Sequence, residues 1–455
     1  MTDISQLYQL YCQHQPLTTD SRDCPEGSTF LALKGDRFDG NQYAVSALQQ
    51  GCAIAIVSDP QVKASAPAEL ADRIVVVADT LQTLKLLARE HRRQFQIPVL
   101  AITGTNGKTT TKELVAAVLK RKYNVLYTEG NLNNDIGVPK TLLRLRPEHE
   151  MAVIEMGASH PGDIRTLVET AEPTCGLITN VGRAHLQGFG SFEGVCRTKG
   201  ELYDWLAAHD GLVFINGADD TLLRLADERS LTRRFTYGIP PTHEEWLRGV
   251  RRQLQVYTNL YACSPCLGLR WLYQKEPWMT VGGETQTQLV GEYNLPNVLA
   301  AVAVGCHFGV VVSDISSALH QYQPDNSRSQ LMKTERNTLI VDAYNANPSS
   351  MELAISNLQQ MQTDQPKVAV LGQMNELGSA SSEEHQRVVD QLRQCGFSRV
   401  LLIGPEFCAL APEGFVCCPD TEAAKQLLAA HPVSGSVVLI KGSNSFRLFE
   451  LPALL

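Results

Sequence analysis

The stretch VLAITGTNGKTT, residues 99–110, combines an apolar run, a glycine loop and the beginning of a helical pattern. The run 99–103 predicts a buried strand, and residues 109–122 predict a helix directly after the loop. Glycines let backbone N–H groups approach phosphate oxygens, because no Cβ stands in the way. Lys108 supplies a charge for the outer phosphates, and Thr109 a hydroxyl for Mg²⁺, at the positive end of the helix. These features predict a triphosphate-binding loop, which comprises Gly104, Thr105, Asn106, Gly107, Lys108, Thr109 and Thr110.

The predicted loop is shorter than the common pattern G-x-x-x-x-G-K-[ST], because Ile102 stands where that pattern has its first glycine. An ordinary glycine turn is the alternative, but the GKT triplet falls where a strand becomes a helix.

Glu155 ends a second apolar run, MAVIE, and open α/β sheets bind ligands at the carboxyl ends of their strands. We therefore interpret Glu155 as a functional residue rather than a helix cap or a surface ion pair. His185 and Lys199 cannot be assigned from spacing, since isolated residues of these types are usually structural or solvated.

Short β-branched runs alternate with helical patterns along the rest of the chain, which predicts an α/β protein with mainly parallel sheets. The region 250–292 differs, because alternating residues and turn signals there predict antiparallel strands. Three α/β units result, with boundaries near 95–98 and 310–325. The remaining predicted strands are 29–33, 53–57, 73–77, 151–155, 176–180, 338–341, 367–371, 399–403 and 436–440. The predicted helices are 42–50, 294–308, 349–361, 382–394 and 421–431, with one more from an Asp79 cap to the basic cluster His91, Arg92 and Arg93, which suits the helix dipole.

The chain has 455 residues, of which 44% are apolar, and a net charge of −8 at pH 7. This apolar content excludes a disordered chain, and the negative charge argues against general nucleic-acid binding. The longest apolar stretch, 298–312, is shorter than the ~20 residues of a membrane span. The polar start does not resemble a secretory leader, so we expect a cytoplasmic protein whose twelve cysteines are reduced thiols. A zinc or redox role for Cys263 and Cys266 stays open, although no second pair follows at zinc-site spacing.

Several motifs occur in a recognisable order along almost the whole chain. They are GTNGKTT (104–110), EMG (155–157), AHLQGFGS (184–191), KGELY (199–203), GEYNLPNVLAA (291–301), DAYNANP (342–348) and LGQMNELG (371–378). Together they resemble the Mur ligases, the ATP-dependent amide-forming enzymes of peptidoglycan synthesis. Two further stretches, TDSR (19–22) and GNLNNDIGVP (130–139), together with the AYNANP part (343–348) of the motif above, are similar to the member of that family that joins D-alanyl-D-alanine to UDP-N-acetylmuramoyl-tripeptide.

The resemblance implies a ligase that activates the tripeptide carboxylate as an acyl phosphate, with ATP as co-substrate and Mg²⁺ as cofactor. It implies a small α/β UDP-substrate-binding domain in 1–96, a central P-loop ATPase in 97–312 and a Rossmann-like domain in 313–455. The expected partners are UDP-N-acetylmuramoyl-tripeptide, D-alanyl-D-alanine and ATP, and we expect a monomer. The third residue of the tripeptide (lysine or diaminopimelate), the base for the amine and the domain arrangement stay open. His385 is in the C-terminal domain, but a helix-surface histidine is the simpler interpretation.

The resemblance also implies roles for individual residues. Lys199 matches the lysine that CO₂ carbamylates, and a carbamate can hold Mg²⁺; Glu155 and His185 match the other metal positions. Asn294 matches an adenine contact, and Arg328 and Asp342 match nucleotide contacts. The expected contacts to the UDP-linked substrate are Ser21, Arg22, Lys34, Asn133, Asn134 and Asn345. The chain departs from the usual residues at Asn41 and Tyr293 (commonly His), Ser159 (commonly Asn) and Ser327 (commonly Gly).

Three alternatives remain at this point. A related amide ligase, such as a folate polyglutamate synthetase or the sibling that adds the third peptide residue, would share the loop and the domain order. An NTPase switch or motor would share only the loop. A family member that has lost catalysis would keep the fold, although Lys108, Glu155, His185 and Lys199 are all present.

Overall fold

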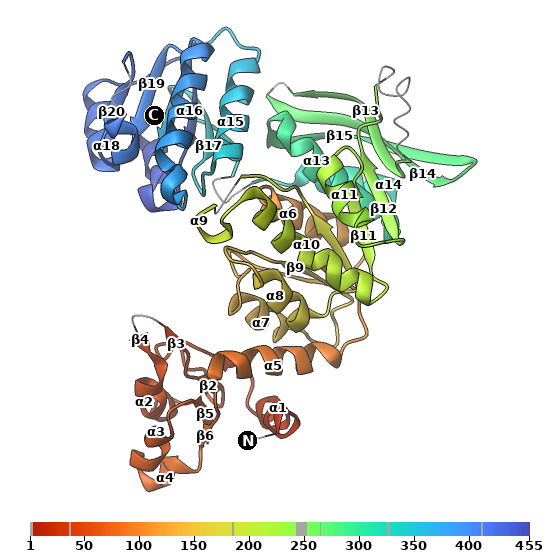
Figure 1. Ribbon diagram of the computed structural model, residues 1–455, viewed down its shortest axis with the longest axis vertical. Coiled ribbons are helices and arrows are strands. Elements are labelled where there is room, and N and C mark those ends of the chain that lie inside the picture. Colours follow the sequence, from red (N-terminus) through yellow and green to blue (C-terminus); the bar gives the residue numbers. More distant parts are fainter. Residues whose placement is uncertain are drawn as a thin grey trace. The chain divides into compact units, whose positions relative to one another are not determined.

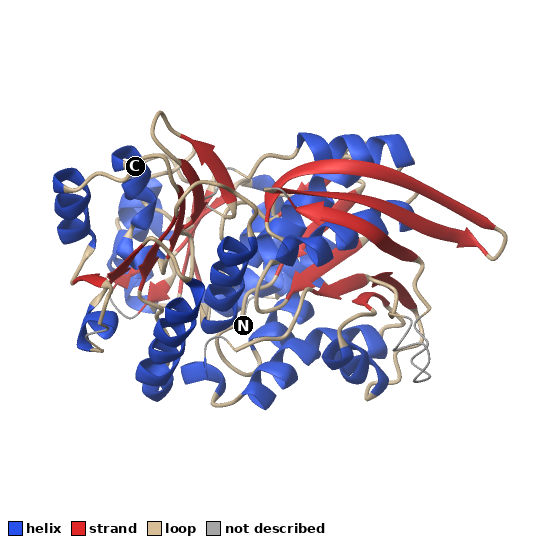
Figure 2. Cartoon of the chain, turned by 90° about the horizontal axis from the view of Figure 1, so that it is seen from above, coloured by secondary structure: helices blue, strands red, loops and turns tan. Residues whose placement is uncertain are grey.

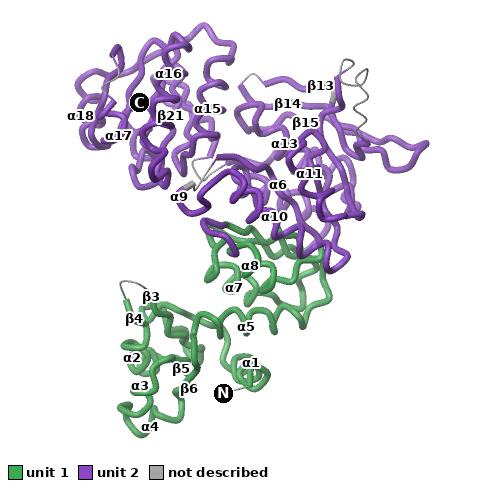
Figure 3. The backbone as a smooth tube through the Cα atoms, viewed as in Figure 1, with its two compact units in different colours: residues 1–101, 124–157, 163–174 green, residues 102–123, 158–162, 175–455 purple. Residues whose placement is uncertain are grey.

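A computed structural model describes residues 3–35, 38–183, 186–242, 253–263, 265–324, 328–410 and 413–455. The chain divides into two units, which Figure 3 shows in different colours. Unit 1 comprises Met1–Ala101, Asn124–Gly157 and Asp163–Thr174, and unit 2 comprises Ile102–Tyr123, Ala158–Gly162 and Cys175–Leu455. Figure 1 labels the helices and strands of both units.

Unit 1 begins with a parallel sheet in the order β1-β2-β5-β6. Three of these strands confirm the sequence prediction, and the short first strand was not predicted. Buried side chains of β2, β5 and α2 form one apolar cluster, which includes Phe30, Ala47 and Val57. The elements of this part are α1 (Ile4–Gln13), β1 (Leu17–Thr18), β2 (Thr29–Leu31), β3 (Lys34–Gly35), β4 (Phe38–Asp39), α2 (Ala44–Gln49), β5 (Ile54–Val57), α3 (Pro60–Ser65), α4 (Ala68–Ala71) and β6 (Ile74–Val76).

The rest of unit 1 packs around α5 (Thr80–Arg93), whose predicted cap Asp79 accepts a hydrogen bond from the backbone of Gln82. Helices α1, α7 (Gly137–Leu142) and α8 (Asp163–Ala171) contact α5, and β8 (Val125–Tyr127) pairs in parallel with β9 (Met151–Glu155). The basic cluster at the end of α5 also forms hydrogen bonds to other segments of the unit. His91 and Arg92 are buried and bind the backbone oxygens of Leu145 and Ala171, at 3.0 and 3.1 Å.

Unit 2 contains a long continuous sheet in the order β20-β19-β18-β21-β17-β16-β15-β14-β13-β12-β11-β10. The antiparallel strands predicted in 250–292 are confirmed as β13, β14 and β15, and Figure 2 shows the long, curved strands of this region. The pair Leu289 and Gln330 joins β15 to β16, the first strand of the C-terminal part. The strands are β10 (Cys175–Ile178), β11 (Leu212–Asn216), β12 (Arg234–Gly238), β13 (Val256–Cys263), β14 (Cys266–Glu276), β15 (Met279–Val290), β16 (Gln330–Lys333), β17 (Thr338–Asp342), β18 (Lys367–Gly372), β19 (Arg399–Ile403), β20 (Val416–Cys418) and β21 (Val437–Lys441).

The C-terminal strands are covered on both faces, as expected for a doubly wound α/β domain. Along β18, Val368 and Val370 belong to one apolar cluster, whereas Ala369 and Leu371 belong to another. This alternation follows from the two-residue period of a strand, which points successive side chains to opposite faces. The helices of unit 2 are α6 (Lys108–Leu119), α9 (Leu186–Phe189), α10 (Phe192–Ala208), α11 (Asp220–Asp227), α13 (Leu295–His307), α14 (Val312–Gln321), α15 (Pro348–Gln360), α16 (Ser381–Cys395), α17 (Pro405–Ala409) and α18 (Thr421–Ala430).

The helices are of the kind that packs against sheets in a globular protein. Within the described ranges, none combines the length and the apolar composition that crossing a bilayer requires.

Candidate active site

The predicted glycine loop lies between β7 (Val99–Thr103) and α6, as the sequence indicated. Gly104 and Gly107 have φ of +140° and +78°, a region that favours glycine. A Cβ on Gly104 would lie 2.0 Å from Oγ1 of Thr179, and a Cβ on Gly107 would lie 2.6 Å from Oδ1 of Asn297. The loop therefore requires glycine at both positions, for its backbone conformation and for its close packing.

Residues at the end of β10 hold the loop. The backbone N–H groups of Thr105 and Asn106 donate to the backbone oxygen and to Oδ1 of Asn180, both at 3.0 Å. Thr179 donates from Oγ1 to the backbone oxygen of Asn106 at 2.6 Å. Lys108 lies over the loop, with Nζ 2.8 Å from the oxygen of Gly104 and 2.9 Å from that of Thr105. The arrangement keeps the lysine charge beside the N-terminus of α6, where anions bind favourably.

The predicted adenine contact, Asn294, belongs to a buried polar network that reaches α6. Its Nδ2 donates to the backbone oxygen of Val290 at 2.9 Å, and its Oδ1 accepts from Nδ2 of Asn297 at 3.0 Å. Oδ1 of Asn297 in turn accepts from the hydroxyl of Thr111 at 3.1 Å. Sequence reasoning missed Asn297, which packs against Gly107 and connects the start of α13 to the glycine loop.

The two predicted nucleotide contacts of the C-terminal part lie in one cluster. Nζ of Lys441 is 2.7 Å from Oδ2 of Asp342 and donates to the backbone oxygen of Asn345 at 3.1 Å. The guanidinium of Arg328 lies over the ring of Tyr344, with 3.9 Å between Cζ and the ring centroid. Lys441 is almost completely buried, and sequence reasoning missed it. Because an uncompensated buried charge is costly, Lys441 and Asp342 stabilise each other in their positions.

A direct contact joins the glycine loop to the DAYNANP segment. Nδ2 of Asn347 donates to Oδ1 of Asn106 at 2.8 Å. The same asparagine caps α15, because its Oδ1 accepts from the backbone N–H of Ser350 at 2.9 Å. Ser349, in the first turn of α15, accepts from the backbone N–H of Arg183 at 3.2 Å. The N-terminus of α15 is thus hydrogen-bonded both to the glycine loop and to the segment that follows β10.

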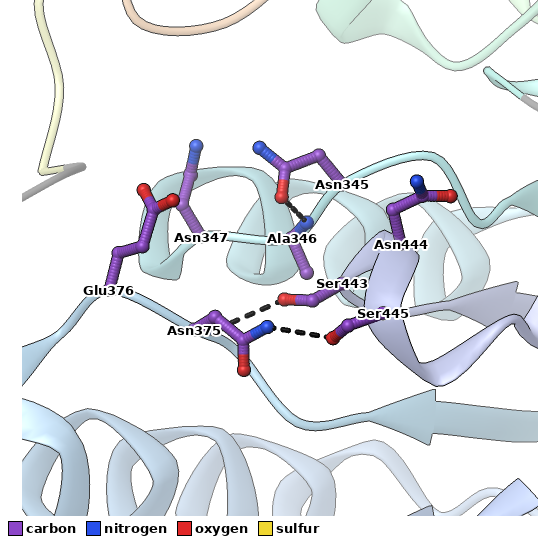
Figure 4. A pocket seen from close by; sticks show the side chains of 8 residues that line it. All are labelled: Asn345, Ala346, Asn347, Asn375, Glu376, Ser443, Asn444 and Ser445. Atoms are coloured by element: carbon purple, nitrogen blue, oxygen red, sulfur yellow. Dashed lines mark hydrogen bonds between the residues drawn. The ribbon is translucent and has the colours of Figure 1, made fainter. Parts of the chain in front are cut away.

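A polar pocket opens next to this contact, at the carboxyl ends of β17, β18 and β21 (Figure 4). Asn375 donates from its backbone N–H to Oγ of Ser443 at 3.0 Å and from Nδ2 to Oγ of Ser445 at 2.8 Å. Figure 4 shows the carboxylate of Glu376 on the same side as the amide of Asn347. Amides, hydroxyls and one carboxylate suit a small ligand that carries charges of both signs. The lining residues are Asn345, Ala346, Asn347, Asn375, Glu376, Ser443, Asn444 and Ser445.

In unit 1, Glu155 stands at the carboxyl end of β9, as predicted, with its side chain almost completely buried. Oε1 of Glu155 accepts from Nδ2 of Asn133 at 2.8 Å, so Asn133 orients the carboxylate. Asn134 accepts from the backbone N–H groups of Ile136 and Gly137 at 3.2 and 2.8 Å and thereby holds the start of α7. The structure thus gives both asparagines local partners within the unit.

Lys199 lies in the middle of α10 and is 2% exposed. Its Nζ is 5.8 Å from the centroid of the Phe189 ring. The interpretation of Lys199 as a solvated surface lysine is therefore wrong. His185, the other metal position implied by the resemblance, lies outside the described residues. Within the described part of the chain, no three His, Cys, Asp or Glu side chains come together as a metal site.

The expected uridine contacts lie in the N-terminal part of unit 1. Arg22 is highly exposed and forms an ion pair with Asp20 at 2.8 Å, which holds the pKa of that carboxyl well below its usual range. Lys34 is exposed and lies 3.6 Å from Asp39. Ser21 directly precedes Arg22 in the same turn. Both basic side chains are exposed and therefore accessible to an anionic ligand.

Asn41, one of the departures from the resemblance, is buried. Its Nδ2 donates to Oδ1 of Asp39 at 2.7 Å. Its Oδ1 accepts from the backbone N–H groups of Ser58 and Asp59 at 2.9 and 3.2 Å. Asn41 therefore connects the end of β4 to the end of β5.

The prediction that His385 lies on a helix surface is wrong. His385 is fully buried, its Nε2 accepts from the backbone N–H of Met374 at 3.0 Å, and its Nδ1 is 2.7 Å from the oxygen of Ser381. This pattern is that of a neutral imidazole, and burial lowers the pKa of His385 accordingly. The histidine positions the segment that carries Asn375 and Glu376.

Cys263 and Cys266 are free thiols at the turn between β13 and β14. Burial raises the pKa of both thiols. A raised pKa disfavours the thiolate that metal binding and redox chemistry require.

Comparison with known proteins tests the resemblance. Models of the Mur ligase family catalytic domain, the Mur ligase middle domain and the Mur ligase glutamate ligase domain match residues 15–92, 102–305 and 327–444. The UDP-N-acetylmuramoyl-tripeptide–D-alanyl-D-alanine ligase of Escherichia coli (strain K12) is 34% identical over 442 residues, which cover 96% of this chain and 92% of that protein. The chain belongs to the Mur ligase family.

Solved structures of Mur ligases extend this result to the fold. Crystal structure I of MurF from Acinetobacter baumannii has a TM-score of 0.84 and 31% identity, and the match covers 99% of this chain and 97% of that one. MurF ligase from Thermotoga maritima in complex with ADP has a TM-score of 0.82 and 26% identity, with 100% and 98% covered. The predicted α/β fold with three Mur ligase domains is therefore confirmed.

Proposed function

We propose that this Mur ligase joins D-alanyl-D-alanine to UDP-N-acetylmuramoyl-tripeptide with consumption of ATP, in the synthesis of peptidoglycan precursors. The proposal rests on the 34% identity, over 96% of this chain, to a ligase named for this reaction. The glycine loop adds support, because its two glycines have the positive φ that a phosphate-binding loop requires. A molecule of ATP is the expected occupant of the loop formed by Gly104–Thr110, in keeping with the ADP bound to the relative from T. maritima.

In the first step, a carboxylate oxygen of the tripeptide attacks the γ-phosphorus of ATP. A new O–P bond forms, the bond between the γ-phosphorus and the β–γ bridging oxygen breaks, and ADP leaves with that electron pair. Both reactants are anions, so charge neutralisation is the main requirement. Lys108 and the N–H groups at the N-terminus of α6 supply fixed positive charge at the outer phosphates.

Mg²⁺ is the proposed cofactor, with Thr109, Glu155, His185 and carbamylated Lys199 as the residues that would hold it. The donor chemistry fits, because hydroxyl and carboxylate oxygens are preferred Mg²⁺ ligands and a carbamate adds two more oxygens. The amide of Asn133 already fixes the orientation of Glu155. When bound, the ion would neutralise phosphate charge and orient the phosphates.

In the second step, the free amine of D-alanyl-D-alanine attacks the acyl carbon. The C–N bond forms, the C–O bond to phosphate breaks, phosphate leaves with that electron pair, and the proton of the amine passes to solvent. We propose that the polar pocket of Figure 4 binds this dipeptide. Glu376 would bind the ammonium group of the incoming dipeptide before that group loses its proton, and Asn375 with Ser443 and Ser445 would donate to the carboxylate, since a zwitterion needs partners of both kinds.

The Glu376→Gln variant tests the assignment of the pocket. We expect the KM for D-alanyl-D-alanine to rise about ten-fold, because a charge-assisted hydrogen bond to the ammonium is lost, while the KM for ATP stays unchanged. Glu383→Gln is the matched control, since Glu383 is an exposed carboxylate on α16 that pairs with Arg387 at 2.6 Å. An equal KM for the dipeptide in all three proteins would contradict the assignment.

Phosphate release with defined substrates tests the function itself. We expect turnover only when ATP, a UDP-N-acetylmuramoyl-tripeptide and D-alanyl-D-alanine are all present, with UDP-N-acetylmuramoyl-pentapeptide as the product in mass spectrometry. Tripeptides that end in lysine and in diaminopimelate, assayed in parallel, identify the preferred third residue. ATP hydrolysis without an acceptor would instead indicate an NTPase, and turnover with a single amino acid would indicate a sibling ligase.

The remaining assignments follow from the same resemblance. We propose that Ser21, Arg22, Lys34, Asn133, Asn134 and Asn345 contact the UDP-linked substrate. The proposed domain limits are 1–96, 97–312 and 313–455, and the proposed location is the cytoplasm, a reducing compartment that suits twelve free thiols. We propose that the enzyme acts as a monomer.

A further inference from the structure

The hydroxyl of Tyr293 forms a contact that the sequence did not predict. It lies 2.7 Å from Oγ of Ser329, a hydrogen bond in which either oxygen can donate. Tyr293 precedes the proposed adenine contact Asn294, and Ser329 follows the proposed nucleotide contact Arg328. One hydrogen bond therefore joins the segment before α13 to the first residues of the C-terminal part.

The backbone of Ser329 explains why this bond matters. Ser329 has φ of +50°, a left-handed conformation that is unfavourable for a residue other than glycine. The side chain of Ser329 is buried, so leaving its hydroxyl without a hydrogen-bond partner would destabilise the fold. In this conformation the backbone N–H of Ser329 points at Oδ1 of Asp342, at 3.3 Å. The bond to Tyr293 stabilises a conformation that the local sequence alone disfavours.

Both proposed nucleotide contacts depend on that conformation. Arg328 is the adjacent residue, and its guanidinium stacks on the ring of Tyr344, so the turn at Ser329 anchors the backbone that carries this side chain. Among the described residues, none forms a hydrogen bond with Nε of Arg328, although this atom is buried. Asp342 receives the N–H of Ser329 on one oxygen and Lys441 on the other.

We propose that Tyr293 is a positioning residue for the nucleotide: its hydroxyl holds Ser329 in the left-handed conformation and thereby sets Arg328 and Asp342 relative to Asn294. The inference rests on the proposed function for the presence of a nucleotide. It adds that a tyrosine connects the adenine side of the site to the C-terminal side. Burial raises the pKa of the Tyr293 hydroxyl, so it stays protonated and able to form the bond at working pH.

Calorimetric titration of the full-length enzyme with ADP and Mg²⁺ tests the proposal. We expect Tyr293→Phe to weaken ADP binding about five-fold, the change that loss of one neutral hydrogen bond produces. Ser329→Ala removes the same bond from the other side and should weaken ADP to the same extent. Tyr123→Phe is the matched control, because Tyr123 donates to the backbone oxygen of Phe308 at 2.7 Å elsewhere in unit 2. It should lower the melting temperature to a similar degree without changing the Kd for ADP.

Ser329→Gly separates positioning from general stabilisation. Glycine adopts φ of +50° without a steric penalty, so the turn no longer needs the tyrosine. The double variant Tyr293→Phe with Ser329→Gly should therefore bind ADP nearly as tightly as the wild type. An unchanged Kd in Tyr293→Phe, or a double variant as weak as Tyr293→Phe, would overturn the positioning role while leaving the proposed function intact. Failure of the wild type to bind ADP would overturn both.

Discussion

Replacement of Lys108 with alanine should lower kcat by at least about 100-fold, a loss of ~3 kcal/mol in the transition state. The reason is electrostatic. Transfer of the γ-phosphoryl group brings a carboxylate onto a polyanion, and Lys108 is the side chain that lies over the phosphate loop. The N-terminal part, which binds the UDP moiety in our proposal, is unaffected by the change. The affinity for UDP-N-acetylmuramoyl-tripeptide should therefore stay within about two-fold of the wild type, since distant sites act independently.

Two measurements check this prediction: kcat from ADP release, and binding of the UDP-tripeptide by calorimetry. Lys120→Ala is the matched control, because Lys120 is an exposed lysine at the other end of the same helix. It should retain full activity. Near-normal turnover of Lys108→Ala would contradict the assignment of the loop, whereas loss of UDP-tripeptide binding would show that the variant is misfolded rather than inactive.

The fold was predictable where a local pattern determines it. The strands 99–103, 151–155 and 399–403 have the predicted bounds, because each is an apolar run bounded by clear turn or polar signals. The glycine loop was predictable for the same reason, since strand, glycines, lysine and helix follow one another directly. Short edge strands such as β1 and β20 were missed, as two or three residues carry too little pattern.

The support of the site was not predictable, because it depends on contacts between distant segments. Asn297 touches a loop 190 residues earlier in the chain, and Lys441 binds an aspartate 99 residues away. Neither residue belongs to a local pattern that indicates these contacts. His385 was misjudged for a related reason: its helix begins with polar residues typical of a surface, but the backbone N–H of Met374 requires a buried acceptor, which the imidazole supplies.

Lys199→Ala should also abolish most turnover, by at least about 100-fold, if the lysine carries a carbamate that helps to hold Mg²⁺. Carbamylation turns the end of the side chain into a carboxylate-like group, and Lys199 lies almost completely buried in the middle of α10. ATP-dependent turnover with UDP-tripeptide and D-alanyl-D-alanine is the measurement. Activity near that of the wild type would contradict any role of Lys199 in the reaction.

Chemical rescue distinguishes a carbamate from an ordinary lysine at this position. Alanine leaves a buried space where the side chain was, and a small ion can enter it. If the missing group is a carbamate, formate or acetate should restore part of the activity of Lys199→Ala, because a carboxylate replaces the lost oxygens. If the missing group is an ammonium, methylamine should restore activity and the acids should not. Lys108→Ala serves as the control for the acids, since it lacks a positive charge and should gain nothing from an anion. Rescue by methylamine alone, or by neither additive, would therefore refute the carbamate while leaving the glycine loop and its lysine untouched.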